Sequence, residues 1–407
     1  MGSAAMTTSC CDHGRPVKIC LISSLGYGLY SPDSGIPFGG AEVQFYLLAN
    51  ALAGDDAYSV SVLTTVDESP GIETRGKLKI FKRLGQRRID SKPQRGFLNR
   101  LQQVWGYLSA FREMRRKFIE IDADMYLHAG AGVEVGAYAL ICRLLRRRFL
   151  FFIASSADLW EPYGKVEGPL KWLFPLGIRL AHQVVCRSRE QQERLMGQYG
   201  RTGVLIRTGH PIPMDNGSAR SVILWVGRIH PLKQPHLFLD LAERCPKDRF
   251  VMIGMRDERE IELWGNTCER ASQLPNVSFH QNLSLQQVDR MFASAKIFVN
   301  TSTYEGFPNT FVQAALNGVP IVSWNVNPDQ VVTQHQIGLY AGGSFDQMLA
   351  AVQSLSGDEP LRAGHARRAR SYAIANHNLD HSVDQLKQIL QSLGALGRTE
   401  RTRTFVS

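Results

Sequence analysis

Short apolar runs alternate along the chain with longer amphipathic segments, and this alternation predicts the secondary structure. Val17–Ser23 has the continuous apolar pattern of a buried first strand, and Ala41–Leu52 follows a polar loop with the pattern of a helix. Tyr58–Thr65 predicts a second strand, and further strands are expected at "ADMYLHA", "RRFLFFIAS" and "HQVVCRS". Apolar strands that alternate with helices indicate a parallel sheet covered on both faces.

A second series of the same kind begins after a break in the pattern. Gly209–Ser221 is rich in Pro, Gly and Ser and predicts a linker. The strand patterns "VILWVGR", "RFVMIGM", "VSFHQNL", "KIFVNTS" and "VPIVSW" follow it. We therefore expect an α/β protein with two doubly wound, Rossmann-like domains, at 1–215 and 216–390, and a polar tail at 391–407 that is disordered. Open α/β sheets bind ligands at the carboxyl ends of their strands, which predicts a site in the cleft between the domains.

Composition places the protein among ordinary globular proteins. The 407 residues are 44% hydrophobic and 21% charged. The densest apolar run, Phe149–Ala154, is far shorter than the ~18 residues that suggest a membrane span. The N-terminus has no signal-peptide pattern, and the seven cysteines lack paired C-x-x-C spacing. These features favour a cytoplasmic protein without a zinc site or a disulfide framework.

Positive charge is concentrated in the first half of the chain. Residues 1–215 hold 28 Lys and Arg against 20 Asp and Glu, a net charge of +8, whereas 216–407 hold 19 against 17, a net charge of +2. Residues 75–117 alone contain 14 basic residues and two acids. This excess favours an anionic partner, either lipid headgroups or nucleic acid. Nucleic-acid binding is not expected, because no RRM, KH or zinc pattern accompanies the charge.

A long amphipathic helix is predicted at 95–118, inside the basic segment. Its apolar stripe, with Trp105 beside it, has 4,3,4,3 spacing and consists of Phe97, Leu101, Val104, Leu108 and Phe111. The same helix carries six cations: Arg95, Arg100, Arg112, Arg115, Arg116 and Lys117. The stripe can pack as core in the first domain, but core packing does not explain so many cations. We therefore expect peripheral binding to an anionic membrane surface, on the inner face of the plasma membrane, through residues 75–117.

Two features at strand ends predict an anion site. In "VGRIHPLKQP", Arg228 ends a buried strand and Lys233 follows five residues later, so that the two cations can clamp a diphosphate. In "FGGAEVQF", Gly39 and Gly40 precede a helix, where a ligand can approach the backbone and free N–H groups favour an anion. The simpler alternatives are two solvated loop cations and an ordinary glycine N-cap.

The stretch "YEGFPNTFVQAALNGVP" connects a predicted strand to a short helix. Asn309 or Thr310 is expected to cap this helix, and Gly318 is expected to stop it. Glu305, just before the turn, can accept hydrogen bonds from sugar hydroxyls, and the backbone from Gly306 through Phe307 and Pro308 to Thr310 lies beside it.

Gln313 in the same stretch has two possible roles. It can contact a ligand from the first turn of the helix, or it can close a capping box with Thr310, which requires no ligand.

Three motifs in order, "GGAE", "VGRIHPLK" and "YEGFPNTFVQAALNGVPIVSW", resemble the retaining glycosyltransferases of family 4, which have the GT-B fold. The resemblance extends from Val17 to about Leu390. It implies that Arg228 and Lys233 bind the diphosphate of a nucleotide sugar and that Glu305 contacts the donor sugar. The residues that it places around the donor are Gly39, Gly40, Gly306, Phe307, Pro308, Asn309, Thr310 and Gln313.

Two positions depart from the pattern of that family. Gln313 stands where the second Glu of an E-x7-E pair usually contacts the ribose, and an amide has one acceptor oxygen where a carboxylate has two. Many members also carry a His after the strand that here reads "FLFFIAS", where this chain has "SSADLW". His128 and Asp158 are the candidates for the acceptor side, although a lone His in such a place is more often structural.

The resemblance implies transfer with retention of anomeric configuration from a nucleotide-diphosphate sugar to a glycan or lipid-linked acceptor, as in surface polysaccharide biosynthesis. No D-x-D pair suggests a metal-bound diphosphate, so neither a metal nor another cofactor is expected. Two alternatives stay open. One is a glycosyltransferase or GT-B epimerase that acts on small soluble molecules, and the other is a non-catalytic nucleotide-sugar-binding protein. The sugar, the base (UDP or GDP) and the acceptor are not fixed by these motifs.

Overall fold

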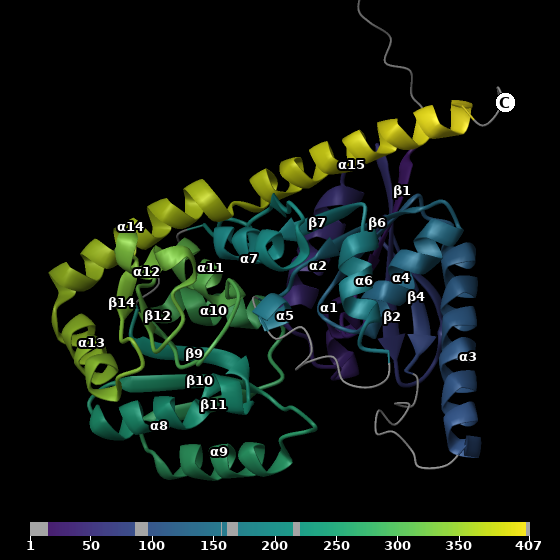
Figure 1. Cartoon of the computed structure of the whole chain (residues 1–407). Coiled ribbons are helices and arrows are strands. Elements are labelled where there is room, and N and C mark those ends of the chain that lie inside the picture. The colour runs from purple at the N-terminus through teal and green to yellow at the C-terminus, as the bar shows by residue number, and fades with distance from the viewer. Residues whose placement is uncertain (1–14, 86–96, 156, 161–169, 215–219, 404–407) are drawn as a thin grey trace, which may run out of the picture.

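The protein folds into two α/β domains, each built around its own sheet (Figure 1). The structure is a computed structural model that describes residues 15–85, 97–155, 157–160, 170–214 and 220–403. Over these residues the two sheets have eight and six strands, which confirms the expected pair of doubly wound domains. Within the same ranges, no helix combines the length and the apolar character needed to cross a bilayer.

The first sheet has the strand order β3-β4-β2-β1-β5-β6-β7-β8. Its neighbours pair in parallel, except that β3 and β4 form an antiparallel pair at one edge. The strands are β1 (Val17–Ile22), β2 (Tyr58–Val66), β3 (Gly71–Arg75), β4 (Leu78–Leu84), β5 (Met125–Ala129), β6 (Arg148–Phe152), β7 (Gln183–Cys186) and β8 (Val204–Leu205). Strand β4 lies in the basic segment and β3 directly precedes it, and the sequence had not predicted either strand.

Helices cover both faces of the first sheet. One face packs against α2, and the other packs against α3, α4 and α6. The helices of this domain are α1 (Tyr27–Tyr30), α2 (Gly40–Ala53), α3 (Phe97–Ile121), α4 (Val133–Leu144), α5 (Ala157–Trp160), α6 (Leu173–Leu180) and α7 (Arg189–Tyr199). Strands that are buried on both sides must be apolar throughout, which is why β6 reads as the unbroken run "FLFF".

The second sheet is parallel, with the strand order β11-β10-β9-β12-β13-β14. Its strands are β9 (Val222–Arg228), β10 (Arg249–Met255), β11 (Val277–Gln281), β12 (Ala295–Asn300), β13 (Ile321–Ser323) and β14 (Gly338–Tyr340). Its helices are α8 (Pro235–Arg244), α9 (Ile261–Gln273), α10 (Leu285–Ser294), α11 (Asn309–Leu316), α12 (Val331–Gln334), α13 (Phe345–Gly357) and α14 (Glu359–His377). Because β9 and β12 are neighbours, the loops that follow them open side by side at one edge.

The last helix, α15 (Leu379–Arg403), leaves the second domain and runs back over the first (Figure 1). Val383, Leu386 and Leu390 are buried in the same apolar cluster as the central strands of the first sheet. Lys387 Nζ lies 2.7 Å from Asp55 Oδ2. This return was not predicted from the sequence: the second domain was expected to end at residue 390 and residues 391–407 to be disordered, whereas α15 continues to Arg403.

The two segments that pass between the domains are hydrogen-bonded to each other. The backbone N–H of His210 donates to the carbonyl of His377, and that of Leu379 donates to the carbonyl of His210, each at 3.0 Å. The amide of Gln44 on α2 exchanges two hydrogen bonds of 3.1 Å with the backbone of Gly209. The two segments that connect the domains are therefore attached to α2, the helix that begins at the cleft.

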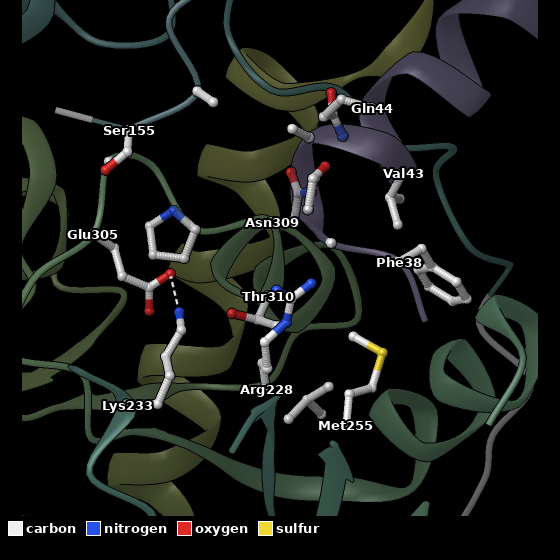
Figure 2. Close-up of a pocket in the computed structure, with 18 of the residues that line it drawn as sticks. Phe38, Val43, Gln44, Ser155, Arg228, Lys233, Met255, Glu305, Asn309 and Thr310 are labelled. Carbon is white, nitrogen blue, oxygen red and sulfur yellow. Dashed lines mark hydrogen bonds and ion pairs between the residues drawn. The ribbon is translucent and has the colours of Figure 1, made fainter. Parts of the chain in front are cut away.

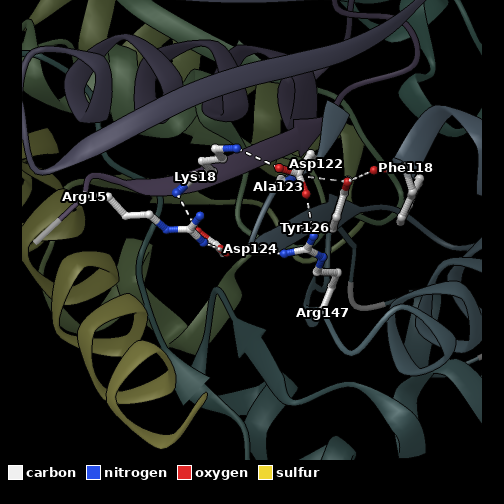
Figure 3. A network of polar contacts seen from close by, with 8 residues as sticks. All are labelled: Arg15, Lys18, Phe118, Asp122, Ala123, Asp124, Tyr126 and Arg147. Carbon is white, nitrogen blue, oxygen red and sulfur yellow. Dashed lines mark hydrogen bonds and ion pairs between the residues drawn. The ribbon is translucent and has the colours of Figure 1, made fainter. Parts of the chain in front are cut away.

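A polar network fastens the amino ends of β1, β5 and β6, on the side away from the cleft (Figure 3). Lys18 Nζ lies 2.7 Å from Asp122 Oδ2, and Arg147 forms ion pairs with both Asp122 and Asp124. The hydroxyl of Tyr126 donates to the carbonyl of Phe118 at 2.6 Å. These contacts fix the relative positions of three neighbouring strands and hence of the loops at their opposite ends.

Candidate functional site

A cavity of about 450 Å³ lies between the domains, where the carboxyl ends of the two sheets face each other. The first domain contributes the start of α2 and the residues at the ends of β5, β6 and β7. The second domain contributes the ends of β9 and β10 and the loop between β12 and α11. The cavity is therefore where parallel sheets are expected to bind ligands.

The cavity has a polar end and an apolar end (Figure 2). Lys233, Glu305 and Ser155 lie toward one end, whereas Phe38, Val43 and Met255 lie toward the other, with Arg228 between the two groups. Such a cavity suits a ligand that combines a charged part with a flat apolar part.

Glu305 is held by three hydrogen bonds in the loop after β12. Asn300 Nδ2 and Ser302 Oγ donate to its Oε1 at 2.8 and 2.6 Å, and Lys233 Nζ lies 2.6 Å from its Oε2 (Figure 2). Burial raises the pKa of Glu305, but the charge of Lys233 and the three hydrogen bonds outweigh burial and leave the pKa below its ordinary value. Glu305 is therefore a fixed, ionised acceptor.

Lys233 reaches Glu305 because the loops after β9 and β12 are bound together. The hydroxyl of Thr301 donates to the carbonyl of Lys233, and the backbone N–H of Thr303 donates to the carbonyl of Leu232 at 2.9 Å. The ammonium group and the carboxylate are thus placed by the backbone of two adjacent strands rather than by long flexible loops.

Arg228 ends β9 and projects into the cavity beside a second carboxylate. Its NH1 lies 3.8 Å from Oδ2 of Asp257, which follows β10 and is 5% exposed. Asp257 accepts hydrogen bonds from the backbone N–H, Nε and NH2 of Arg259 at 3.1, 3.0 and 2.9 Å, and these hold its pKa well below the usual range. Since Arg259 already satisfies Asp257, Arg228 keeps its hydrogen-bonding capacity for a ligand.

Gly39 and Gly40 face Arg228 from the first domain. A Cβ on Gly39 would lie 2.7 Å from Oε2 of Glu42, which accepts the Gly39 N–H at 3.0 Å. A Cβ on Gly40 would lie 2.8 Å from Nδ2 of Asn309, which donates to the Gly40 carbonyl across the cleft. Both contacts are with the ends of flexible side chains, so a Cβ at either position would displace Glu42 or Asn309 without a clash with the backbone. Helix α2 begins directly at the cavity.

A further contact ties the domains together beside the cavity. The carboxylate of Asp329, in the second domain, accepts the backbone N–H groups of Arg189 and Glu190 at 3.0 and 3.1 Å, at the start of first-domain helix α7. A carboxylate is favoured at this position because the first N–H groups of a helix lack partners within the helix. The two domains thus contact each other directly beside the cavity.

The expected cap of α11 is wrong. The helix begins at Asn309, its N-cap is Pro308, and no side chain caps it, whereas Gly318 does follow its end with a φ of 63°. Because Pro308, with its fixed φ, is the N-cap, the helix starts at Asn309, one residue earlier than a cap at Asn309 would require. Neither Asn309 nor Thr310 acts as a cap.

Gln313 consequently does not form a capping box. It is 6% exposed, lines the cavity, and its Nε2 donates to Asp289 Oδ1 on α10 at 2.8 Å. Burial raises the pKa of Asp289 and the hydrogen bond from Gln313 partly offsets this. Because the amide nitrogen is used, the amide oxygen of Gln313 is the atom that can accept from a ligand.

The two acceptor-side candidates lie outside the lining of the cavity. His128 is buried in the first-domain core, 5.1 Å from the Tyr138 ring, with its Nδ1 3.4 Å from the carbonyl of Ile22. Burial lowers its pKa to about 4. The carboxylate of Asp158 accepts the backbone N–H of Ser155 at 2.9 Å and so shapes the turn after β6. Of this segment, Ser155 itself lines the cavity.

Four charged residues at the cavity were not predicted from the sequence. Asp257 and Asp289 contact Arg228 and Gln313, and Arg187 and Arg259 line the cavity. Asp257 lies just after one predicted buried strand and Arg187 near the end of another, and that position is the signal that could have indicated them. Over the described ranges, no group of three or more His, Cys, Asp and Glu side chains is placed to hold a metal ion.

Comparisons with known proteins agree with this geometry. Residues 220–358 match the family model of the glycosyl transferases group 1. D-inositol 3-phosphate glycosyltransferase of Mycolicibacterium paratuberculosis is 26% identical over 181 residues, 43% of this chain and 40% of that protein. The lipopolysaccharide core biosynthesis glycosyltransferase LpsE of Rhizobium meliloti is 21% identical over 216 residues, 52% of this chain and 62% of that protein. The matches thus span less than two thirds of these relatives.

Solved structures resemble the chain over nearly its whole length. Sucrose-phosphate synthase from Thermosynechococcus elongatus has a TM-score of 0.72 at 16% identity and covers 93% of this chain and 100% of its own. HepE from Anabaena, solved with UDP and glucose, has a TM-score of 0.66 at 16% identity and covers 92% and 100%. The chain therefore has the GT-B fold, and its residues 220–358 match the glycosyl transferases group 1.

Proposed function

We propose that the protein is a retaining glycosyltransferase of family 4. It transfers a hexose from a nucleotide-diphosphate sugar to a glycan or lipid-linked acceptor, in surface polysaccharide biosynthesis. One observation carries the proposal: Arg228, Lys233 and Glu305 converge in one cavity opposite the glycine start of α2. The glycosyltransferase relatives and the UDP and glucose bound to the HepE structure support it.

In this proposal the diphosphate lies between the two domains. Arg228 and Lys233 approach it from the second domain, and the free N–H groups of the first turn of α2 approach it from the first. The base extends toward Phe38 and Met255, and the ribose toward Gln313. When the phosphate draws Lys233 away, Glu305 becomes available to the hydroxyls of the donor sugar.

The reaction breaks the bond between the anomeric carbon and the diphosphate oxygen, which takes the electron pair. Arg228 and Lys233 stabilise the charge that develops on that oxygen. The acceptor oxygen forms the new bond on the same face of the sugar. Its proton passes to the departing phosphate, so the transfer does not require the buried His128 as a base.

The described part of α3 suits a membrane surface. Met114, Phe118 and Ile121 pack into the core, whereas the opposite face carries residues at 3,4,3,4 spacing, Trp105, Leu108, Arg112, Arg115 and Ile119, with Arg116 beside them. Trp105 is 61% exposed and Leu108 is 45% exposed. Residues 95 and 96 and the side chains at 97–104 lie outside the described residues. The protein is proposed to be cytoplasmic and peripheral to an anionic membrane.

Arg228→Ala and Lys233→Ala are each expected to weaken nucleoside-diphosphate binding. Loss of one charge-assisted contact costs about 1.5–3 kcal/mol, which corresponds to a roughly 10- to 150-fold rise in Kd. Calorimetry with UDP and GDP measures this change. Arg256→Ala is the matched control, because Arg256 lies in the same segment as Asp257, pairs with Glu258 and does not line the cavity. Unchanged affinity in both folded variants would remove the clamp.

The contact between Gln313 and Asp289 allows the ribose assignment to be tested by an exchange. Gln313→Glu alone places two carboxylates at hydrogen-bond distance, so we expect a lower Tm and no gain in ribose binding. Gln313→Glu with Asp289→Asn restores an amide–carboxylate pair with the carboxylate at the cavity. For each protein the ratio of the Kd for the 2′-deoxy analogue to the Kd for UDP or GDP is measured. We expect this ratio to be larger in the double variant than in the wild type. An unchanged ratio excludes Gln313 as a ribose ligand.

Vesicle sedimentation tests the membrane proposal. The wild type is expected to bind anionic vesicles at low salt and to dissociate from them at high salt, because salt screens the electrostatic attraction. It is not expected to bind neutral vesicles. Arg115→Gln with Arg116→Gln removes two adjacent exposed cations from α3 and should reduce binding. Arg367→Gln with Arg368→Gln removes a similar pair from α14 and should not. Equal binding to both vesicle types, or to neither, would favour a soluble acceptor.

A further inference from the structure

Arg187 is a buried cation on the first-domain wall of the cavity. It directly follows β7, is 6% exposed and lines the cavity together with Thr208 and Gln44. Its backbone N–H donates to Gln191 Oε1 at 2.7 Å, which fixes the start of the side chain. The donor-binding roles proposed above do not use it.

The guanidinium of Arg187 has few protein partners. Its NH1 donates to the carbonyl of Ile206 at 3.3 Å, and its Cζ lies 5.0 Å from the centre of the Phe152 ring. Among the described residues, no carboxylate forms an ion pair with it. A guanidinium has five N–H donors, so most of its hydrogen-bonding capacity remains unused.

Arg201 shows how an arginine with a structural role is held in the same domain. Its NH1 donates to the carbonyls of Ile178, Arg179 and Ala181 at 2.7, 2.7 and 2.8 Å, near the end of α6, and it does not line the cavity. Arg187 is more deeply buried and has one such carbonyl. Burial lowers the pKa of Arg187 to about 10, so it remains charged at neutral pH.

The other cations of the cavity have carboxylate partners. Lys233 pairs with Glu305, and both Arg228 and Arg259 pair with Asp257. Within the described part of the chain Arg187 has no carboxylate partner, and a buried charge without a counter-ion destabilises a fold. The cavity therefore presents a cation from the first domain that an incoming anion would neutralise.

We propose that Arg187 is an anion-binding residue of the first domain, which takes a phosphate or carboxylate group of a substrate. This inference rests on the proposed function and deepens it, because it requires an anionic group in contact with the first domain. That group is either the donor diphosphate, which the two domains would then hold from both sides, or an anionic substituent of the acceptor. Planar bidentate hydrogen bonding makes arginine suited to both.

Arg187→Met tests the proposal, because methionine keeps an apolar stem against Phe152 and removes the charge. In a buffer without phosphate, we expect its Tm to equal or exceed that of the wild type, since an uncompensated buried charge is lost. Its apparent Kd for at least one anionic probe should rise tenfold or more. Arg201→Met is the matched control and should lower the Tm while leaving the affinity for anions unchanged.

Three probes identify the source of the anion. Weaker UDP and GDP binding assigns Arg187 to the donor diphosphate. The second probe is glucose 6-phosphate, added at saturating nucleoside diphosphate and compared with neutral glucose. If Arg187→Met weakens the binding of glucose 6-phosphate alone, Arg187 binds an anionic group of the acceptor. The third probe, thermal stabilisation by inorganic pyrophosphate, tests the anion site even if no nucleotide binds, so that a failure of this proposal can be distinguished from a failure of the proposed function. Unchanged response to all three probes in folded Arg187→Met would overturn the proposal.

Discussion

The carboxyl ends of two parallel sheets face each other across one cavity, and the properties of the protein follow from this constraint. Parallel strands end in loops and helix N-termini at the same edge, which gathers unpaired backbone N–H groups and polar side chains there. The cleft brings together Gly39–Gly40 from one sheet and Arg228, Lys233 and Glu305 from the other. The polar network at the amino ends and the return of α15 hold the first sheet on the opposite side.

Charge balance in the cavity explains how these groups coexist without a ligand. Glu305 neutralises Lys233, and Asp257 is shared between Arg228 and Arg259. In the proposed function, an incoming diphosphate replaces these contacts, because Arg228 and Lys233 both line the cavity. Contacts of Asn309 with Gly40 and of Asp329 with the start of α7 already hold the domains together.

The sequence predicted what depends on local pattern. Continuous apolar runs predicted the strands β1, β2, β5–β7 and β9–β13. The helix expected at Ala41–Leu52 is α2, which begins one residue earlier, at Gly40. It did not predict the edge strands β3 and β4, because a basic, half-exposed pair lacks that pattern. The Thr310 cap was wrong because Pro308 is the N-cap, so that α11 starts at Asn309, two residues earlier than a Thr310 cap requires. The burial of Arg187 depends on Phe152 and Ile206, distant in sequence, and an arginine after a strand is ordinarily solvated.

A cavity that activates a nucleotide-diphosphate sugar, as we propose, should also hydrolyse its donor slowly when no acceptor is present. Purified protein is incubated with a panel of UDP- and GDP-hexoses, and release of the nucleoside diphosphate is followed together with the anomer of the freed sugar by NMR. We expect release from at least one donor, with the anomeric configuration retained at first appearance, and loss of release in Glu305→Gln. Release from none of the donors, with no thermal stabilisation by any of them, would rule out activation of a nucleotide sugar in this cavity.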